Sequence, residues 1–354
     1  MNVVRIDDLR DCLVAAFERL GLDPEDADGL AGLLLDSELR GHPDHGVAAL
    51  GLLIRLYSDG TLNPRPRARV LRESDGALLL DGDRGCGPAQ PARAMRWCIE
   101  RARERKGMAV AAVRNWQLIA AGPYARIAAE AGLIGFACTN FNALVAPPGG
   151  RTAVLGTNPL AYGLPAHRHP PVVFDVATTV VAMQKVRVAA EKGESMPAGL
   201  IFDRLGLPTT DPAAFLEGGS LAPLGSPQAP HKGFGLALLI DVLSGVLSGA
   251  GFAQGVATDA PGNFLWALDL EAFLPRAEFL ARIDALVDQI KQGDRAPGVE
   301  ELVVPGELGD RRHRTLTAAG AVALEPAGWQ ILTASCEAVG VPVPTAVDRG
   351  GERS

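Results

Sequence analysis

The sequence Gly156-Thr157-Asn158-Pro159, with Gly149-Gly150 shortly before it, stands in a segment rich in glycine, proline and asparagine that runs from residue 139 to 170. We expect this segment to form loops, and long loops inside a compact domain usually carry function. A glycine has no Cβ to keep an anion such as a pyrophosphate away from backbone N–H groups. Locally, a pair of tight turns explains these glycines equally well.

A second stretch, Asp175-Val176-Ala177-Thr178-Thr179, directly follows a β-type run at residues 172–174. Its backbone groups and threonines would lie at a strand end, where cofactors commonly dock. A strand-to-helix turn with a threonine cap is the structural alternative. The two stretches together predict a ligand site built from loops and one strand end.

A Rossmann fingerprint does not accompany these stretches. The nearest candidate, Gly85-Cys86-Gly87, continues with Pro88-Ala89-Gln90, where that fingerprint needs a third glycine opening a helix. Any NAD or NADP site therefore has another architecture, or the chain binds no nucleotide. Walker, HExxH and GxSxG motifs are also absent from the sequence, and it predicts no metal site.

The segments on both sides of residues 139–170 predict an α/β fold of the mixed α+β kind. The first 70 residues carry apolar residues at helical spacing, with Gly21, Gly41 and Gly60 as stops. Beyond them, short β-type runs are interspersed with helical patterns. The runs are residues 77–80, 108–113, 133–138, 172–174 and 264–270, and the helical patterns are residues 88–105, 123–131, 232–248, 276–291 and 328–339.

Length and composition limit the class of protein. The chain has 354 residues, enough for two compact domains, and its 47% hydrophobic and 21% charged residues argue against wholesale disorder. We expect a helical domain of residues 1–72 joined by a C-terminal helix within 313–347, a cofactor-binding and catalytic domain of residues 73–312, and a tail from 348 to 354. The net charge of -7 disfavours non-specific binding of nucleic acid.

The N-terminal sequence lacks the basic start of a signal peptide, so we expect a cytoplasmic protein. Residues 233–253 approach the length of a membrane span, but Asp241 stands in their middle and predicts a buried helix instead. The five cysteines are scattered without a CxxC pair. We therefore expect buried free thiols rather than disulfides or a zinc site.

Seven segments in collinear order resemble the malate/L-lactate dehydrogenase family, a non-Rossmann group that includes sulfolactate dehydrogenase, ureidoglycolate dehydrogenase, diketogulonate reductase and Δ1-piperideine-2-carboxylate reductase. Each segment alone is weak, but seven in order are hard to obtain by chance. The segments are residues 40–46 (RGHPDHG), 146–150 (APPGG), 156–159 (GTNP), 175–179 (DVATT), 208–212 (PTTDP), 231–235 (HKGFG) and 305–307 (PGE).

The resemblance implies NAD or NADP as the cofactor. Lys232 stands just before an apolar helix and near a phosphate would act as a flexible point charge, whereas a solvated lysine is the alternative. The sequence assigns no residue to the ribose 2′ position, so it does not choose between the two cofactors. The implied contacts are Gly149, Gly150, Gly156, Thr157, Asn158, Asp175, Val176, Ala177, Thr178, Thr179, Lys232, Gly233, Pro305, Gly306 and Glu307.

The substrate side departs from the family pattern Ser-His-Gly-x-x-Arg. The histidine, a proton donor or acceptor in the family, is kept as His45, but the serine is Asp44 and the arginine that helps to hold a substrate carboxylate is Ala49. Histidine suits acid–base catalysis because its pKa lies near neutrality. We expect the Asp44 carboxylate to raise the pKa of His45. A capped helix start is the structural alternative.

A second family histidine, in the pattern Ser-x-His-Phe-Gly-Ala-Ala-Gly, corresponds to Gln117 within residues 115–122. A glutamine can hydrogen-bond a substrate atom but cannot exchange a proton at physiological pH. Proton transfer must then fall to His45, Asp44, Tyr124 or water.

These departures predict an NAD(P)H-dependent oxidoreductase that reduces a C=N or C=O bond of a small amino-acid-like, cyclic imine or 2-oxo acid substrate. Malate and lactate are disfavoured because their carboxylate has lost a bidentate arginine. The alternatives are an isomerase, cyclase or lyase that uses bound nicotinamide without net redox change, and a degenerate binding subunit. The resemblance further implies a homodimer and a sulfolactate-dehydrogenase-like cofactor domain with a mixed or antiparallel sheet.

Overall fold

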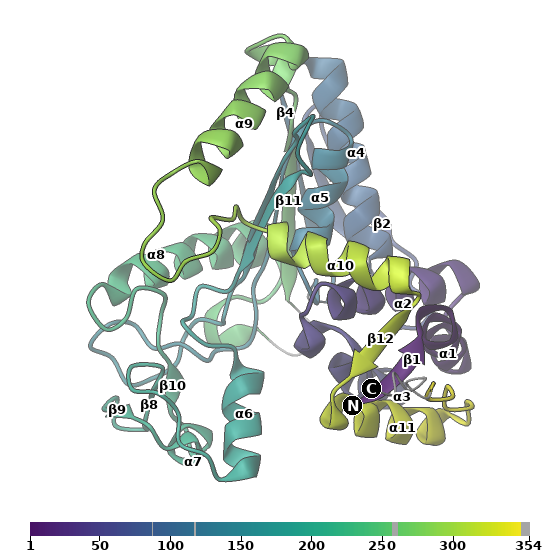
Figure 1. Ribbon diagram of the computed structural model, residues 1–354, viewed down its shortest axis with the longest axis vertical. Coiled ribbons are helices and arrows are strands. Elements are labelled where there is room, and N and C mark those ends of the chain that lie inside the picture. The colour runs from purple at the N-terminus through teal and green to yellow at the C-terminus, as the bar shows by residue number, and fades with distance from the viewer. Residues whose placement is uncertain (87, 117, 257–260, 348–354) are drawn as a thin grey trace.

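A seven-stranded mixed sheet forms the centre of the molecule (Figure 1). The structure is a computed structural model that describes residues 1–86, 88–116, 118–256 and 261–347. All neighbouring strands of this sheet run antiparallel except β3 and β4, which are parallel. In spatial order the strands are β2 (Arg69–Glu73), β3 (Ala77–Asp81), β4 (Met108–Arg114), β11 (Gly262–Leu268), β5 (Ile134–Thr139), β6 (Leu160–Leu164) and β7 (Val172–Val176). The predicted mixed sheet without Rossmann topology is confirmed.

Two helices, α4 (Ala89–Arg105) and α5 (Gly122–Glu130), cover one face of this sheet (Figure 1). Alanines of β4, β5 and β11 are fully buried beneath them and keep the helices close to the strands. At Gly135 and Gly163 a Cβ would collide with the backbone carbonyl of Ala125 in α5. The small residues of the strands therefore set how deeply α5 settles on the sheet, which fixes its N-terminus near the end of β7.

The other face of the sheet packs against α8 (Pro230–Asp241), which continues as a π-helical turn at Val242–Val246 (Figure 1). Ile240 contacts Cys138 and Phe264 in a small apolar cluster there. Asp241 is buried at the end of this helix, as its position in the sequence predicts. Among the described residues, no helix combines the length and apolar character needed to cross a bilayer.

A helical part forms from the two ends of the chain and shares one apolar core. Its helices and strands are α1 (Ile6–Arg19), α2 (Pro24–Leu39), α3 (Leu50–Ser58), α11 (Pro326–Val339), and the antiparallel pair β1 (Asn2–Arg5) and β12 (Ala321–Leu324). The helix α10 (Glu307–Ala319) joins this part to the sheet, because Asp310 in α10 pairs with both Arg40 of α2 and Arg126 of α5.

A smaller unit follows β7 and has its own apolar cluster around Val186, Ile201 and Phe215. It contains α6 (Met183–Lys192), α7 (Pro212–Leu216) and the three-stranded sheet of β8 (Ile201–Phe202), β9 (Pro208–Thr209) and β10 (Ser220–Leu221). The helix α9 (Arg276–Lys291) has the predicted bounds.

One expectation about the central loops is wrong. Residues 139–170 contain the strand β6 (Leu160–Leu164), which pairs with β5 and β7. Its five residues include a glycine and are flanked by prolines, so composition alone favoured a loop. Hydrogen bonds from β5 on one side and β7 on the other hold residues 160–164 as a strand. Local propensity does not reveal such long-range partners.

Candidate functional site

His45 lies on a 3-10 turn, η1 (Pro43–His45), just after α2. Glu38 of α2 holds the next residues, because its Oε2 accepts the N–H of Val47 at 3.0 Å. Gly46 is required between them, since a Cβ there would collide with the Glu38 carboxylate. The buried Glu38 thereby fixes the turn and leaves the side chain of His45 accessible to solvent.

Asp175, at the end of β7, is the charged group that most strongly raises the pKa of His45. Its Oδ2 accepts the N–H of Ala121 at 3.0 Å and that of Gly122 at 2.6 Å, which anchors the carboxylate at the start of α5. The structure thus brings together a histidine and a carboxylate that the sequence assigns to separate roles. The negative charge of Asp175 acts on the imidazole at the junction of the helical part and the sheet.

Desolvation by the surrounding protein has the largest effect on the pKa values of His45 and Asp175. Desolvation lowers the pKa of His45, and the negative charges of Asp175 and Asp44 oppose that effect without overcoming it. Desolvation raises the pKa of Asp175, opposed first by the N–H of Gly122 and then by His45. Both side chains stay accessible to solvent, although the surrounding protein displaces much of their water. Asp44 therefore acts in the expected direction, but desolvation outweighs it, so the expected net rise in the pKa of His45 is wrong.

The structure removes Tyr124 from the catalytic candidates. Tyr124 is 1% exposed, and its hydroxyl donates to the carbonyl of Leu118 at 3.3 Å inside the core beneath α4 and α5. Burial also raises its pKa. The hydroxyl can therefore neither reach a substrate nor release a proton readily. Gln117, the other candidate on this segment, lies outside the described residues.

Three of the predicted cofactor segments meet through a chain of backbone hydrogen bonds. The carbonyl of Thr157 accepts the N–H of Thr178 at 2.9 Å, and the carbonyl of Thr178 accepts the N–H of Leu224 at 2.8 Å. The carbonyl of Leu224 accepts the N–H of Gly233 at 3.0 Å, so residues 156–158, 175–179 and 232–233 are neighbours. Gly233 is required for this contact, because a Cβ would collide with the backbone of Leu224.

Several side chains of these segments point into the protein rather than toward a ligand. Asn158 is fully buried, its Nδ2 donates to the carbonyl of Ala237 at 2.9 Å, and its Oδ1 accepts the N–H of Phe141 at 3.1 Å. The hydroxyl of Thr178 donates to the carbonyl of Thr157 at 2.8 Å, and that of Thr179 to the carbonyl of Val181 at 2.9 Å. These three side chains use polar atoms to hold the segments together, and their predicted contact with a cofactor stays a prediction.

Replacing Asn158 by alanine is expected to lower the free energy of unfolding by about 2–4 kcal/mol, because it orphans a buried N–H and weakens the surroundings of the Asp241 carboxylate. Chemical denaturation measures this. Thr157→Ala is the matched control, with a change below about 1 kcal/mol, since only the backbone of Thr157 joins the contacts above. Equal unfolding of both variants would contradict the structural role of Asn158.

Other groups in the same region are open and suited to an anion. Lys232 is exposed on the first turn of α8, where the helix dipole is positive. Just before this helix, the Ser226 hydroxyl is buried and, within the described part of the chain, has no hydrogen-bond partner. Gly149 and Gly150 lie on an exposed turn closed by a 2.7 Å hydrogen bond to Pro147. An unsatisfied hydroxyl and a free cation at a helix N-terminus fit the phosphates of a nicotinamide dinucleotide.

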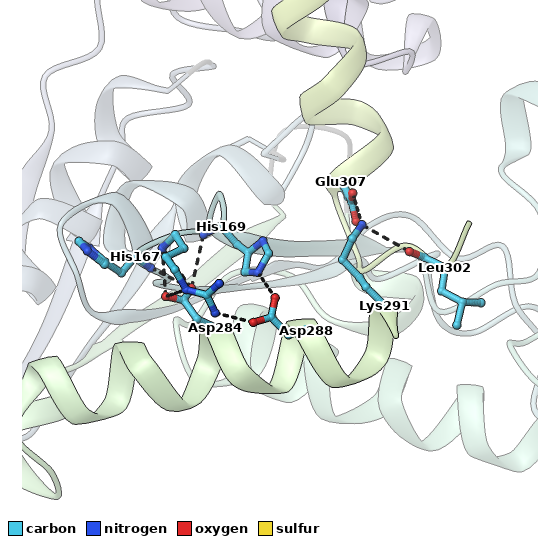
Figure 2. Close-up of polar contacts among 8 residues, drawn as sticks. His167, His169, Asp284, Asp288, Lys291, Leu302 and Glu307 are labelled. Atoms are coloured by element: carbon cyan, nitrogen blue, oxygen red, sulfur yellow. Dashed lines mark hydrogen bonds and ion pairs between the residues drawn. The ribbon is translucent and has the colours of Figure 1, made fainter. Parts of the chain in front are cut away.

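The predicted contact Glu307 has a partner inside the protein. Gly306 adopts a φ of 83° against the backbone of Val173 in β7, which places the start of α10 at this strand. The Glu307 carboxylate pairs with Lys291 at the end of α9, as Figure 2 shows, and with Arg311. The carboxylate therefore joins α9 to α10, and its predicted contact with a cofactor stays a prediction.

The helix α9 is held at a second place by a carboxylate in a nest of backbone N–H groups. Asp284 accepts the N–H groups of His167 and Arg168 at 3.2 and 3.0 Å, on the turn between β6 and β7 (Figure 2). Asp288, one turn further along α9, lies 2.8 Å from the Nε2 of His169. These contacts fix α9 against the same two strands that position Asp175.

A model of the family described as malate/L-lactate dehydrogenase matches residues 4–333. The chain belongs to the malate/L-lactate dehydrogenase family. Its identification as an oxidoreductase of this family is thereby confirmed. Within the family it is 38% identical to a malate dehydrogenase of Pyrococcus abyssi over 319 residues, which covers 87% of this chain and 88% of that protein.

Solved structures of the malate/L-lactate dehydrogenase family have the same fold. The sulfolactate dehydrogenase of Methanocaldococcus jannaschii is 30% identical with a TM-score of 0.86, covering 96% of this chain and 98% of that one. The Δ1-piperideine-2-carboxylate reductase of Pseudomonas syringae pvar. tomato is 29% identical with a TM-score of 0.82, covering 96% and 99%. The predicted sulfolactate-dehydrogenase-like fold is confirmed.

Sequence reasoning named Asp175 as a cofactor contact and Asp241 as a buried residue, but it missed Glu38 and the contacts of all three. Glu38 supports the His45 turn. The Asp241 carboxylate accepts hydrogen bonds from the Nδ2 of Asn140 at 3.2 Å and the N–H of Ala253 at 2.9 Å, and the charge of Asp175 acts on His45. The lone acid in the apolar run 233–253 was the one available signal for Asp241. The other two depend on contacts that helical or strand periodicity does not reveal.

Proposed function

We propose that this chain is an NAD(P)-dependent dehydrogenase that interconverts a small 2-hydroxy acid and the corresponding 2-oxo acid. The observation that carries the proposal is the convergence of segments 156–158, 175–179 and 232–233, with Asp175 anchored at the start of α5 where its charge acts on the accessible His45. Malate and sulfolactate, in the names of the relatives above, are both 2-hydroxy acids. His45 supplies proton transfer at a place where backbone groups and Lys232 are available to a dinucleotide.

In the proposed reaction, different residues bind the cofactor, transfer the proton and stabilise the resulting charge. Lys232, Gly233 and the backbone of residues 176–179 would hold a nicotinamide dinucleotide, which would supply or accept the hydride. Neutral His45 accepts the hydroxyl proton of the substrate during oxidation and returns it during reduction. The carboxylate of Asp175, anchored by Ala121 and Gly122, stabilises the imidazolium that results.

The substrate pocket differs from the family pattern at Ala49, which cannot pair with a carboxylate. The negative charges that act on His45 come from Asp175 and Asp44. Two acids beside the base favour a substrate with a cationic group, and this supports a second candidate function, the reduction of a cyclic imine with a protonated C=N bond. The reductase from Pseudomonas syringae carries such chemistry in its name. Within the first candidate function, the missing arginine at Ala49 favours 2-hydroxy acids other than malate and lactate.

A substrate panel tests these functions. The full-length protein would be assayed with NADH and with NADPH against pyruvate, oxaloacetate, larger 2-oxo acids and a cyclic imine 2-carboxylate, following the absorbance of the reduced nicotinamide. Turnover of a 2-oxo acid supports the first function, and turnover of the imine alone supports the second. Product formed without a net change in nicotinamide would favour an isomerase, cyclase or lyase, whereas no binding of either cofactor would overturn the proposal.

Replacing Lys232 by glutamine is expected to weaken cofactor binding by about three- to tenfold, because a phosphate loses one charge-assisted contact. Titration of the protein with NADH and NADPH measures the change. Lys192→Gln is the matched control, since Lys192 is equally exposed but lies on α6. Identical affinities for both variants would remove Lys232 from the cofactor site.

We also propose that a second copy of this chain covers the outer side of α8. That side exposes a continuous set of large apolar residues, which is uncommon on a monomer. The set is Leu236, Leu238, Leu239, Val242, Val246 and Leu247. Light scattering after size exclusion is expected to give twice the chain mass of 37.0 kDa, and Leu239→Lys is expected to shift the protein toward the monomer. A wild-type monomer at micromolar concentration would contradict this.

A further inference from the structure

Two cysteines from opposite ends of the chain meet in the core of the helical part. Cys12 lies on α1 and Cys336 on α11, and their Sγ atoms are 3.1 Å apart. Cys12 is 6% exposed and Cys336 is fully buried, both in the apolar cluster that the two helices share. All five cysteines are buried, as expected, and none is joined in a disulfide in the part of the chain that the structure describes.

We propose that Cys12 and Cys336 form an intramolecular disulfide when the protein meets a small-molecule disulfide oxidant. One protein thiolate attacks the S–S bond of the oxidant, forms a mixed disulfide and releases one thiol. The second protein thiolate then attacks the protein sulfur of that mixed disulfide and releases the other half of the oxidant as a second thiol. Both cysteine sulfurs are oxidised, the two sulfurs of the oxidant are reduced, and two thiol protons pass to the leaving thiolates.

The geometry supports this bond at this pair of cysteines. A disulfide places its sulfur atoms about 2.05 Å apart, so a further approach of about 1 Å, within reach of small side-chain rotations, would form it. The other buried thiols have different neighbours, since Cys98 points at the carbonyl of Leu265 at 4.0 Å and Cys138 lies 3.4 Å from the Ser244 hydroxyl. The hydrogen bond from Cys12 lowers the pKa of Cys336, which favours the thiolate that the exchange needs.

The bond would have a mechanical consequence for the fold. It would close a loop of nearly the whole chain, from residue 12 to residue 336, and long loops lose the most unfolded-state entropy on cross-linking. The helix α11 also packs against α3 and against the turn η2 (Val47–Ala49), which begins two residues after His45. A cross-linked α11 would therefore stiffen the support of the His45 turn as well as the helical part itself. This inference does not depend on the proposed reaction.

Thiol counting and peptide mapping test the proposal on the full-length protein. The reduced protein is expected to show its five thiols after unfolding. After folded protein is treated with oxidised glutathione and the glutathione is removed, we expect three thiols, a loss of two hydrogens in intact mass, and a non-reduced peptide that joins residues 12 and 336. Five remaining thiols, or glutathione still attached to Cys12 or Cys336, would overturn the proposal.

Thermal unfolding supplies an independent readout. The oxidised protein is expected to unfold about 4 °C or more above the reduced protein. Cys12→Ser and, separately, Cys336→Ala should abolish this difference, whereas the matched control Cys98→Ser should keep it, because Cys98 lies under the sheet and away from the pair. If either Cys12→Ser or Cys336→Ala does not fold, the remaining variant still tests whether the disulfide forms at this pair. The assignment of the disulfide to Cys12 and Cys336 would be contradicted if Cys98→Ser lost the difference in unfolding temperature while Cys12→Ser kept it.

Discussion

His45→Ala is expected to lower kcat/KM by about 10³-fold in both directions of the reaction, while NADH and NADPH bind as before. The reason is that the accessible imidazole of His45, whose pKa responds to Asp175, transfers the proton in the proposed reaction. The hydroxyl of Tyr124 is buried in the core and cannot replace it. Steady-state rates and cofactor titration measure the two quantities separately. His169→Ala is the matched control, since His169 pairs with Asp288 on α9. Unchanged turnover in His45→Ala would refute the assigned role.

The pH dependence of the wild-type enzyme tests the assignment of proton transfer to His45. Because burial lowers the pKa of His45 below its usual value of about 6.5, the imidazole is neutral at pH 7. In the oxidation direction kcat/KM should therefore be flat near neutrality and fall as the pH drops through that lowered pKa, since a protonated imidazole cannot accept a proton. In the reduction direction the protonated donor is lost as the pH rises through the same pKa. A rate that changes only above pH 8 would point to another group.

Asp175→Asn is expected to lower kcat by about 10²-fold or more, because the imidazolium formed in oxidation loses its countercharge. The negative charge of Asp175 raises the pKa of His45, so its removal should also move the acid limb of the oxidation profile to lower pH. A stability change alone would not move that limb. An unshifted limb would show that Asp175 does not act through His45.

Asp175→Ala separates the electrostatic role from the structural one. The asparagine variant keeps an oxygen that can accept the N–H groups of Ala121 and Gly122, whereas alanine leaves both without this partner at the start of α5. We expect alanine to lower the free energy of unfolding by about 1–2 kcal/mol relative to asparagine, as measured by urea denaturation. Equal stability of the two variants would show that the carboxylate does not cap α5.

The elements with strong local patterns could be predicted from the sequence. The helix α9 has the predicted bounds, and β3, β4, β5, β7 and β11 each overlap a predicted run, because their periodicity reflects burial that every such element needs. The strand β6 could not be predicted, since its short Gly-containing sequence becomes a strand through the hydrogen bonds of β5 and β7. The same holds for β1 and β12, which pair across almost the whole chain.

The sequence by itself determined the family, the absence of a Rossmann fingerprint, and the retention of His45 where the family's arginine is replaced by Ala49, because these are matters of residue identity and order. Only the tertiary structure decided what each group does. In the folded protein the charge of Asp175 acts on His45, the Asn158 side chain donates a hydrogen bond to the carbonyl of Ala237, and Glu307 forms an ion pair with Lys291. The physical reason is that a pKa and a hydrogen-bond partner depend on distance and solvent, and folding sets both between residues that lie far apart in the chain.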